Sequence, residues 1–181
     1  MAHKKQRLLR GTSALAGLVL AGAVGAHFIF NRADSEPAIE KYISATADGR
    51  ELHVPDYRLD GVKCSQYARL TAQSIFGITY PMADAWNRPQ VDEVVASVRN
   101  FDELRNTAIK PGMIVGLYNP SSQYNAEGRP FTHTGLYLGK NSNDRPVFAH
   151  YYHNDSLVET DHQLAKRGLE PRVVLKAKSN K

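Results

Sequence analysis

The sequence predicts an α+β domain in which helices come first and pack on a central antiparallel sheet. Before residue 107, apolar residues recur at helical spacing; after Pro111-Gly112, β-branched and aromatic runs alternate with turn residues. Helices that are followed by a meander of strands are typical of the α+β class. A chain of 181 residues has room for one such domain and a targeting segment.

Residues 1–32 are interpreted as a membrane-targeting leader. They carry five basic residues and no acidic one, and a long uncharged stretch rich in Ala, Gly, Leu and Val follows the basic start. That stretch approaches the roughly 20 residues that cross a bilayer, so we expect contact with the inner membrane through residues 8–30. The basic flank favours a domain outside the inner membrane, in the periplasm. A cleaved signal peptide would instead give a secreted protein, and both fates stay open.

The net charge of +5 is explained by the leader alone, because the rest of the chain has 18 basic and 18 acidic residues. A neutral body lacks the basic surplus of a nucleic-acid-binding domain. We therefore expect no nucleic-acid partner, and we also expect no cofactor.

Residues 33–54 are polar, and we interpret them as a tether with a short helix near residues 38–44. The compact domain is expected over residues 55–181. Its first helix should run from Cys64 to Phe76 and end at Gly77, a typical residue after a helix C-terminus. Valines at helical spacing predict a second helix over 91–98, and a third is expected over 102–107.

The second half of the domain is expected to form the sheet. Strands are predicted over residues 113–118, 131–139, 146–152 and 172–176. A polar loop should cover 119–130, and a hairpin turn should cover 141–145.

Cys64 is the only cysteine, so it cannot form a disulfide within the chain. It is a buried thiol, an intermolecular link or a reactive group. In the first turn of a helix, free N–H groups and the helix dipole would stabilise a thiolate.

A thiol nucleophile needs a base, and His133 is the candidate. In a strand, His133, Gly135 and Tyr137 share one face. Because Gly135 has no side chain, we expect the small-sided first helix to pack there and to bring Cys64 to the imidazole. His150 on the next strand is the candidate for orienting His133.

The residues just beyond His150 compete for that orienting role. His153, Asn154 and Asp155 lie in the turn that we expect after the strand.

Four segments together resemble the ordered motifs of the NlpC/P60 peptidases and the wider group that includes the CHAP amidases. They are Lys63-Cys64-Ser65-Gln66, residues 110–118, Thr132-His133-Thr134-Gly135, and Val147-Phe148-Ala149-His150. The resemblance covers roughly residues 55–152. Lys63, Gln66 and Met113 stand where the family usually has Asp, Gly and Asp.

The resemblance implies a papain-like fold and a set of roles. Cys64 would be the nucleophile, His133 the general base and then acid, and His150 the orienting group. The backbone N–H of Cys64 or Ser65 would face the oxyanion. Tyr57 corresponds to a tyrosine beside the oxyanion in some members, or is a packing aromatic. Trp86 lines the substrate groove or belongs to the core.

The resulting hypothesis is a thiol-dependent hydrolase that cleaves amide bonds of peptidoglycan stem peptides through a thioester. Endopeptidase and amidase activities both stay open, as does the presence of a protein inhibitor. One alternative is a zinc site built from His133, His150, His153 and Asp155. Another is a membrane-tethered wall-binding or scaffold protein without turnover.

Overall fold

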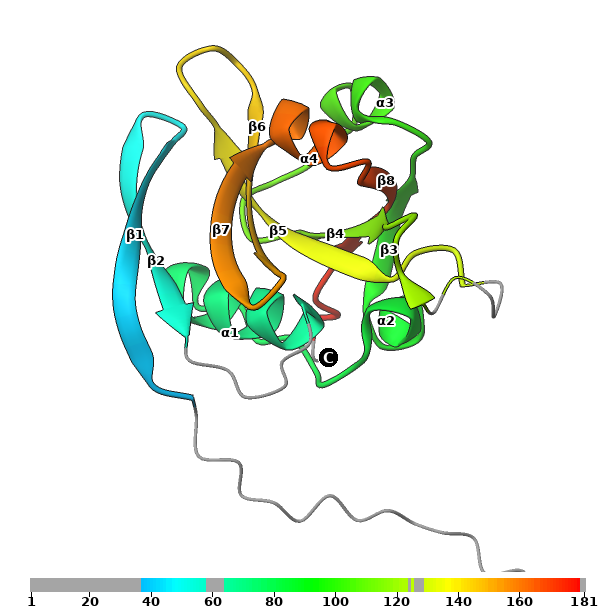
Figure 1. Ribbon diagram of the computed structural model, residues 1–181, viewed down its shortest axis with the longest axis horizontal. Coiled ribbons are helices and arrows are strands. Elements are labelled where there is room, and N and C mark those ends of the chain that lie inside the picture. The colour runs from blue at the N-terminus through cyan, green and yellow to red at the C-terminus, as the bar shows by residue number, and fades with distance from the viewer. Residues whose placement is uncertain (1–36, 58–63, 124, 126–128, 180–181) are drawn as a thin grey trace, which may run out of the picture. The chain divides into compact units, whose positions relative to one another are not determined.

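The structure is a computed structural model that describes residues 37–57, 64–123, 125 and 129–179. Its centre is a six-stranded sheet with strand order β3-β8-β4-β5-β6-β7, and every neighbouring pair is antiparallel (Figure 1). The strands are β3 (Glu93–Ser97), β4 (Ile114–Tyr118), β5 (His133–Lys140), β6 (Pro146–Tyr152), β7 (Asp155–Thr160) and β8 (Glu170–Lys176). The predicted α+β class is confirmed.

A separate hairpin precedes the sheet. β1 (Ile39–Ala47) pairs with β2 (Arg50–Tyr57) around Asp48 and Gly49, both at positive φ. The predicted helix near 38–44 is therefore wrong, and much of the predicted tether is folded. Asp-Gly between two runs is a strong hairpin signal, because both residues tolerate the positive φ of the turn.

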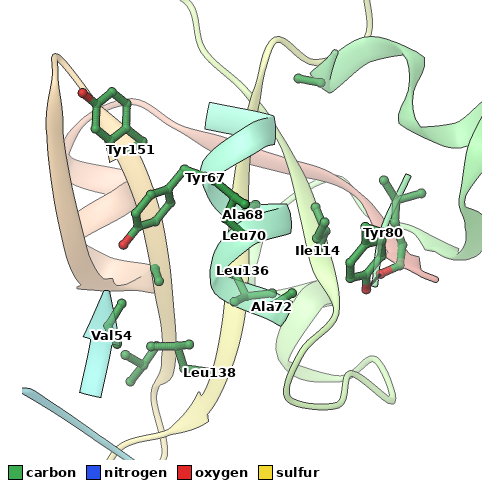
Figure 2. Close-up of a cluster of buried hydrophobic side chains, with 14 of the residues drawn as sticks. Val54, Tyr67, Ala68, Leu70, Ala72, Tyr80, Ile114, Leu136, Leu138 and Tyr151 are labelled. Carbon is green, nitrogen blue, oxygen red and sulfur yellow. Dashed lines mark hydrogen bonds between the residues drawn. The ribbon is translucent and has the colours of Figure 1, made fainter. Parts of the chain in front are cut away.

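Helix α1 (Cys64–Phe76) covers one face of the sheet, as predicted for a helix with small residues. Ala68 and Ala72 are fully buried and belong to the same apolar cluster as Leu136 and Leu138 of β5 (Figure 2). Gly77 ends the helix at a φ of +66°, as expected for the residue after a helix C-terminus.

The side chains on the face covered by α1 also pack tightly around Gly116 of β4. A Cβ atom added to Gly116 of β4 would lie 2.7 Å from side-chain atoms of both Phe131 and Val173. Glycine at this position is therefore a requirement of the apolar cluster beneath α1.

The opposite face of the sheet is covered by α3 (Phe101–Arg105) and α4 (Asp161–Lys166). Leu104 and Leu164 from these helices pack in a second apolar cluster with Phe148 and Val174 of the sheet. The fold thus has three layers, with α1 on one face of the sheet and the two short helices on the other.

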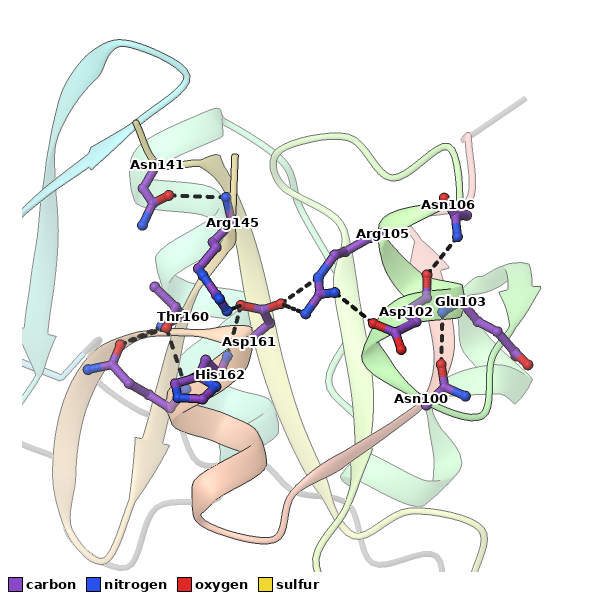
Figure 3. A network of polar contacts seen from close by, with 11 residues as sticks. Asn100, Asp102, Glu103, Arg105, Asn106, Asn141, Arg145, Thr160, Asp161 and His162 are labelled. Atoms are coloured by element: carbon purple, nitrogen blue, oxygen red, sulfur yellow. Dashed lines mark hydrogen bonds and ion pairs between the residues drawn. The ribbon is translucent and has the colours of Figure 1, made fainter. Parts of the chain in front are cut away.

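A fully buried carboxylate, Asp161, connects these short helices to the sheet (Figure 3). It pairs with Arg105 of α3 at 2.6 Å and with Arg145 of the β5–β6 turn at 3.5 Å. Thr160 and Gln163 form a capping box at the start of α4. These contacts fix the position of α4, which follows directly after β7.

Residues 91–98 do not form the predicted helix. Arg88–Val91 is a short helix, α2, preceded by a single turn of 3-10 helix, η1 (Ala85–Asn87), and Glu93–Ser97 is the edge strand β3. The valines favour a strand because their branched side chains suit a pleated surface, and pairing with β8 decides the outcome. β7 and α4 were not predicted.

The predicted leader lies outside the described residues. Within the part of the chain that the structure describes, none of the helices has the length and apolar character to cross a membrane.

Candidate active site

Cys64 is the first residue of α1, and its side chain lies against the start of β5. Its Sγ atom is 3.9 Å from the carbonyl oxygen of Thr132. Burial raises the pKa of the thiol above its ordinary value. The nearby polar groups of Thr134 and the N–H of Ser65, together with the charge of Arg88, offset part of that increase.

His133 lies at one end of a chain of hydrogen-bonded side chains on three neighbouring strands. Its Nε2 atom is 3.1 Å from Nδ1 of His150, and Nε2 of His150 is 3.0 Å from Oε2 of Glu159. These residues come from β5, β6 and β7, and all three are buried. We refer to His133, His150 and Glu159 as the histidine relay.

Arg167, the residue after α4, holds the far end of the relay. Its guanidinium donates hydrogen bonds to both carboxylate oxygens of Glu159, at 2.6 to 3.0 Å. Burial by itself would raise the pKa of Glu159, but the hydrogen bonds from His150 and Arg167 bring it down to about 2. Glu159 is therefore ionised at neutral pH.

The ionised carboxylate determines where the protons of the relay lie. A carboxylate accepts hydrogen bonds, so Nε2 of His150 carries the proton in their contact. Nδ1 of a neutral His150 then accepts from Nε2–H of His133. The remaining nitrogen of neutral His133, Nδ1, holds a lone pair and can act as a base.

His133 itself is kept neutral. Burial, followed by the neighbouring His150, lowers its pKa well below 6.5, and the negative charge of Glu159 compensates only in part. The ring also packs edge-on against Tyr152, with the ring centres 5.5 Å apart.

The thiol and the imidazole belong to different faces of the sheet. His133 pairs with Leu117, which lies in the apolar cluster of α3 and α4, whereas Thr134 and Cys64 lie on the α1 side. No hydrogen bond links Cys64 to His133 among the described residues. The Sγ atom instead touches the main chain next to His133.

The predicted packing of α1 against Gly135 is therefore wrong. A Cβ atom on Gly135 would meet Phe148 and Leu117, both in the cluster opposite α1. The small residues of α1 instead accommodate Leu136 and Leu138, the large residues on the alternate positions of β5. The sequence pattern correctly separated the two faces of β5. It wrongly predicted that α1 packs on the face of Gly135 rather than on the face of Leu136 and Leu138.

Ser65 is fully buried and serves as an anchor through its side chain. Its hydroxyl donates to the carbonyl oxygen of Ala83 at 2.5 Å and accepts from Nε of Arg88 at 2.9 Å. Only its backbone N–H, which favours the ionised form of the neighbouring thiol, remains to act on a group at Cys64.

Tyr57 and Trp86 have different surroundings. The hydroxyl of Tyr57 donates to the carbonyl of Leu70 at 3.3 Å, about 9 Å along the helix from Cys64. Tyr57 thus contacts the middle of α1, and its role beside an oxyanion stays a prediction. Trp86 is half-buried beside the α1 cluster, and the guanidinium of Arg129 lies 3.7 Å from the centre of its ring.

His150, rather than one of the three residues of the following turn, lies within hydrogen-bond distance of His133, and its orienting role stays a prediction. His153 and Asn154 have positive φ in the turn between β6 and β7, and Asp155 is exposed at the start of β7. In the described ranges, no cluster of three or more His, Cys, Asp or Glu side chains is arranged to hold a metal ion.

Sequence reasoning missed Glu159, Arg167 and Arg88. Glu159 and Arg167 lie beyond residue 152, where the recognised motifs end, and the short β7 segment, with adjacent Leu157 and Val158, has no alternating pattern that would have predicted a strand beside His150. The sequence around Arg88 does not indicate that its side chain is buried, because an arginine in a polar segment is usually exposed to solvent.

Comparison with protein-family models, with curated proteins and with solved structures finds no match for this chain. The chemical proposals below therefore rest on the residues of this chain.

Proposed function

We propose that this chain is a cysteine hydrolase of the papain-like NlpC/P60 type that cleaves amide bonds in peptidoglycan stem peptides. The proposed location is outside the inner membrane, with residues 8–30 as the membrane contact. One observation carries the proposal. The contacts of His133, His150 and Glu159 leave Nδ1 of a neutral His133 available as a base, and Sγ of Cys64 contacts the carbonyl oxygen of Thr132, the residue immediately before His133.

The proposed reaction starts with transfer of the thiol proton of Cys64 to Nδ1 of His133. The thiolate attacks the amide carbonyl, and the N–H of Ser65 stabilises the oxyanion. The protonated imidazole then gives its proton to the leaving amine, which leaves a thioester. Water, deprotonated by His133, hydrolyses the thioester and restores the thiol.

This reaction requires the imidazole and the thiol to meet, and in the described conformation they do not. His133 is the first residue of β5, directly after Thr132, which lies outside any strand. The proposal therefore includes a local movement of Thr132 and His133 on substrate binding that brings the ring to the thiol. This movement breaks the bond between His133 and His150, so the relay orients the imidazole only in the resting conformation.

The direct test is digestion of purified peptidoglycan by the full-length protein in detergent, with the released fragments identified by mass. Cys64→Ala should abolish release, and His133→Gln should reduce the rate by about 10²–10⁴-fold. His153→Gln, an exposed histidine in the adjacent turn, is the matched control and should retain activity. Fragment masses also separate endopeptidase from amidase cleavage. Wild-type protein that releases no fragments would refute the proposal.

The second candidate is a membrane-tethered wall-binding scaffold without turnover. Two observations favour it: Cys64 and His133 lie on different faces of the sheet, and burial raises the pKa of the thiol. Alkylation by iodoacetamide across pH discriminates between the candidates. A scaffold thiol should react only as pH approaches the range of an ordinary cysteine, with or without His133→Gln. A catalytic thiol should react at lower pH and lose that reactivity in the variant.

A further inference from the structure

A fully buried guanidinium is bonded to the first turn of α1. Nε of Arg88 donates to Oγ of Ser65 at 2.9 Å, and Nη2 donates to the Ser65 carbonyl at 3.1 Å. The remaining Nη1 donates to Oδ2 of Asp92 at 2.8 Å, and both side chains of this ion pair are fully buried. Tyr80 lies beside the guanidinium, 5.5 Å from ring centre to Cζ.

Burying a charged pair is expensive, so its presence beside Cys64 calls for a physical reason. Asp92 uses one carboxylate oxygen only, and Oδ1 has no hydrogen-bond partner in the part of the chain that the structure describes. Burial raises the pKa of Asp92, and the bond and charge of Arg88 oppose that increase. Arg88 also favours the ionised form of the Cys64 thiol.

The fork of the guanidinium suits the two bonds to Ser65. Two N–H groups in a fixed plane hold the side-chain and main-chain oxygens of one residue, which a lysine cannot do. Because Ser65 directly follows Cys64, these bonds fix the orientation of the N–H groups that face the thiol.

We propose that Arg88 is the positioning residue of the thiol: its two bonds to Ser65 fix the first turn of α1 and hold a buried positive charge beside the residue that follows Cys64. The consequence for catalysis rests on the proposed hydrolase function, whereas the effect on the thiol does not. Among the described residues, the other titratable groups around Arg88 and the thiol are Asp92, which partly neutralises Arg88, Tyr80, and His133 across the sheet. Thr132, just before β5, and Thr134 of β5 lie on the thiol side and carry no charge.

Three variants of the full-length protein test the inference, with the thiol pKa measured from the pH dependence of iodoacetamide alkylation. Arg88→Met with Asp92→Leu removes both charges, retains apolar volume and should raise the thiol pKa by about one unit. Asp92→Asn leaves the guanidinium without its counter-charge and should lower the thiol pKa. Arg88→Lys retains the charge but loses the two bonds to Ser65, so it should raise the thiol pKa less than the double variant does and should reduce kcat about tenfold or more.

The opposite signs separate this role from a purely structural one. If Arg88 and Asp92 form a purely structural ion pair, the thiol pKa should change in the same direction in the double variant and in Asp92→Asn, or should not change in either. Each of these results would overturn the inference. Thermal unfolding of each variant confirms that the measured thiol belongs to folded protein. If the thiol pKa responds as stated while wild-type protein cleaves no peptidoglycan, the proposed function fails and the role of Arg88 stands.

Discussion

Acidification is expected to destabilise this fold through a single buried imidazole. The pKa of His133 is lowered well below 6.5 in the folded state, whereas the unfolded chain binds a proton near that value. The stability from neutral His133 is therefore fully present above pH 6.5 and is lost as the pH falls below it. Each pH unit below 6.5 costs about 1.4 kcal/mol for one proton, so the loss at about pH 5 is about 2 kcal/mol.

The assay is urea unfolding at several values between about pH 8 and pH 5, with His133→Gln compared with wild type. The free energy of unfolding of wild type should fall more steeply with acid, by about 2 kcal/mol over this range. His162→Gln, in an exposed position on α4, controls for the loss of an ordinary histidine and should keep the wild-type slope. Equal slopes for wild type and His133→Gln would refute the assignment of a neutral buried His133.

Three further predictions concern the sheet and the buried carboxylates. Gly116→Ala should destabilise the protein by about 1–3 kcal/mol in urea unfolding, because the added Cβ would lie 2.7 Å from two side chains. Gly135→Ala, whose Cβ would have 3.5 Å of space, should change stability by less than about 1 kcal/mol, and equal losses would contradict this packing. Glu159→Gln should cost about 1–2 kcal/mol at neutral pH, limited by the partly exposed guanidinium that binds it. Because the folded pKa of Glu159 is about 2, that difference should shrink as the pH falls from 4.5 towards 2, and a constant difference would exclude the carboxylate as its source. Asp161→Asn should lower the free energy of unfolding by about 1–3 kcal/mol, since two guanidinium groups lose a buried partner, and an unchanged thermal melting curve would contradict this.

Much of the fold was predictable where local signals agree with the tertiary structure. Helix α1 has the predicted bounds, and strands β4, β5, β6 and β8 lie where branched and aromatic runs occur. The errors fall where a short segment is compatible with both helix and strand. Residues 39–47 and 93–97 form strands because each pairs with another strand that satisfies its backbone hydrogen bonds. The partners are β2 for residues 39–47 and β8 for residues 93–97.

The candidate site shows the same limit at the level of side chains. Period-two alternation correctly placed His133 and Gly135 on one face and indicated that His150 is close. Alternation cannot tell which of two faces a helix will cover when both have room for it. Here the larger residues Leu136 and Leu138 provided more apolar area to bury beneath α1, so burial rather than the empty space at Gly135 decided the face.

The separation of the relay and the thiol along the chain has a consequence for the order of folding. His150 is 17 residues from His133 and 9 from Glu159, and all three belong to consecutive hairpins. Closing such short loops loses little chain entropy, so this half of the site can assemble as a local unit. Cys64 contacts Thr132 across 68 residues, which makes its docking a long-range event. The contacts among His133, His150 and Glu159 are accordingly expected to form early in folding, and the contact of Cys64 with Thr132 late.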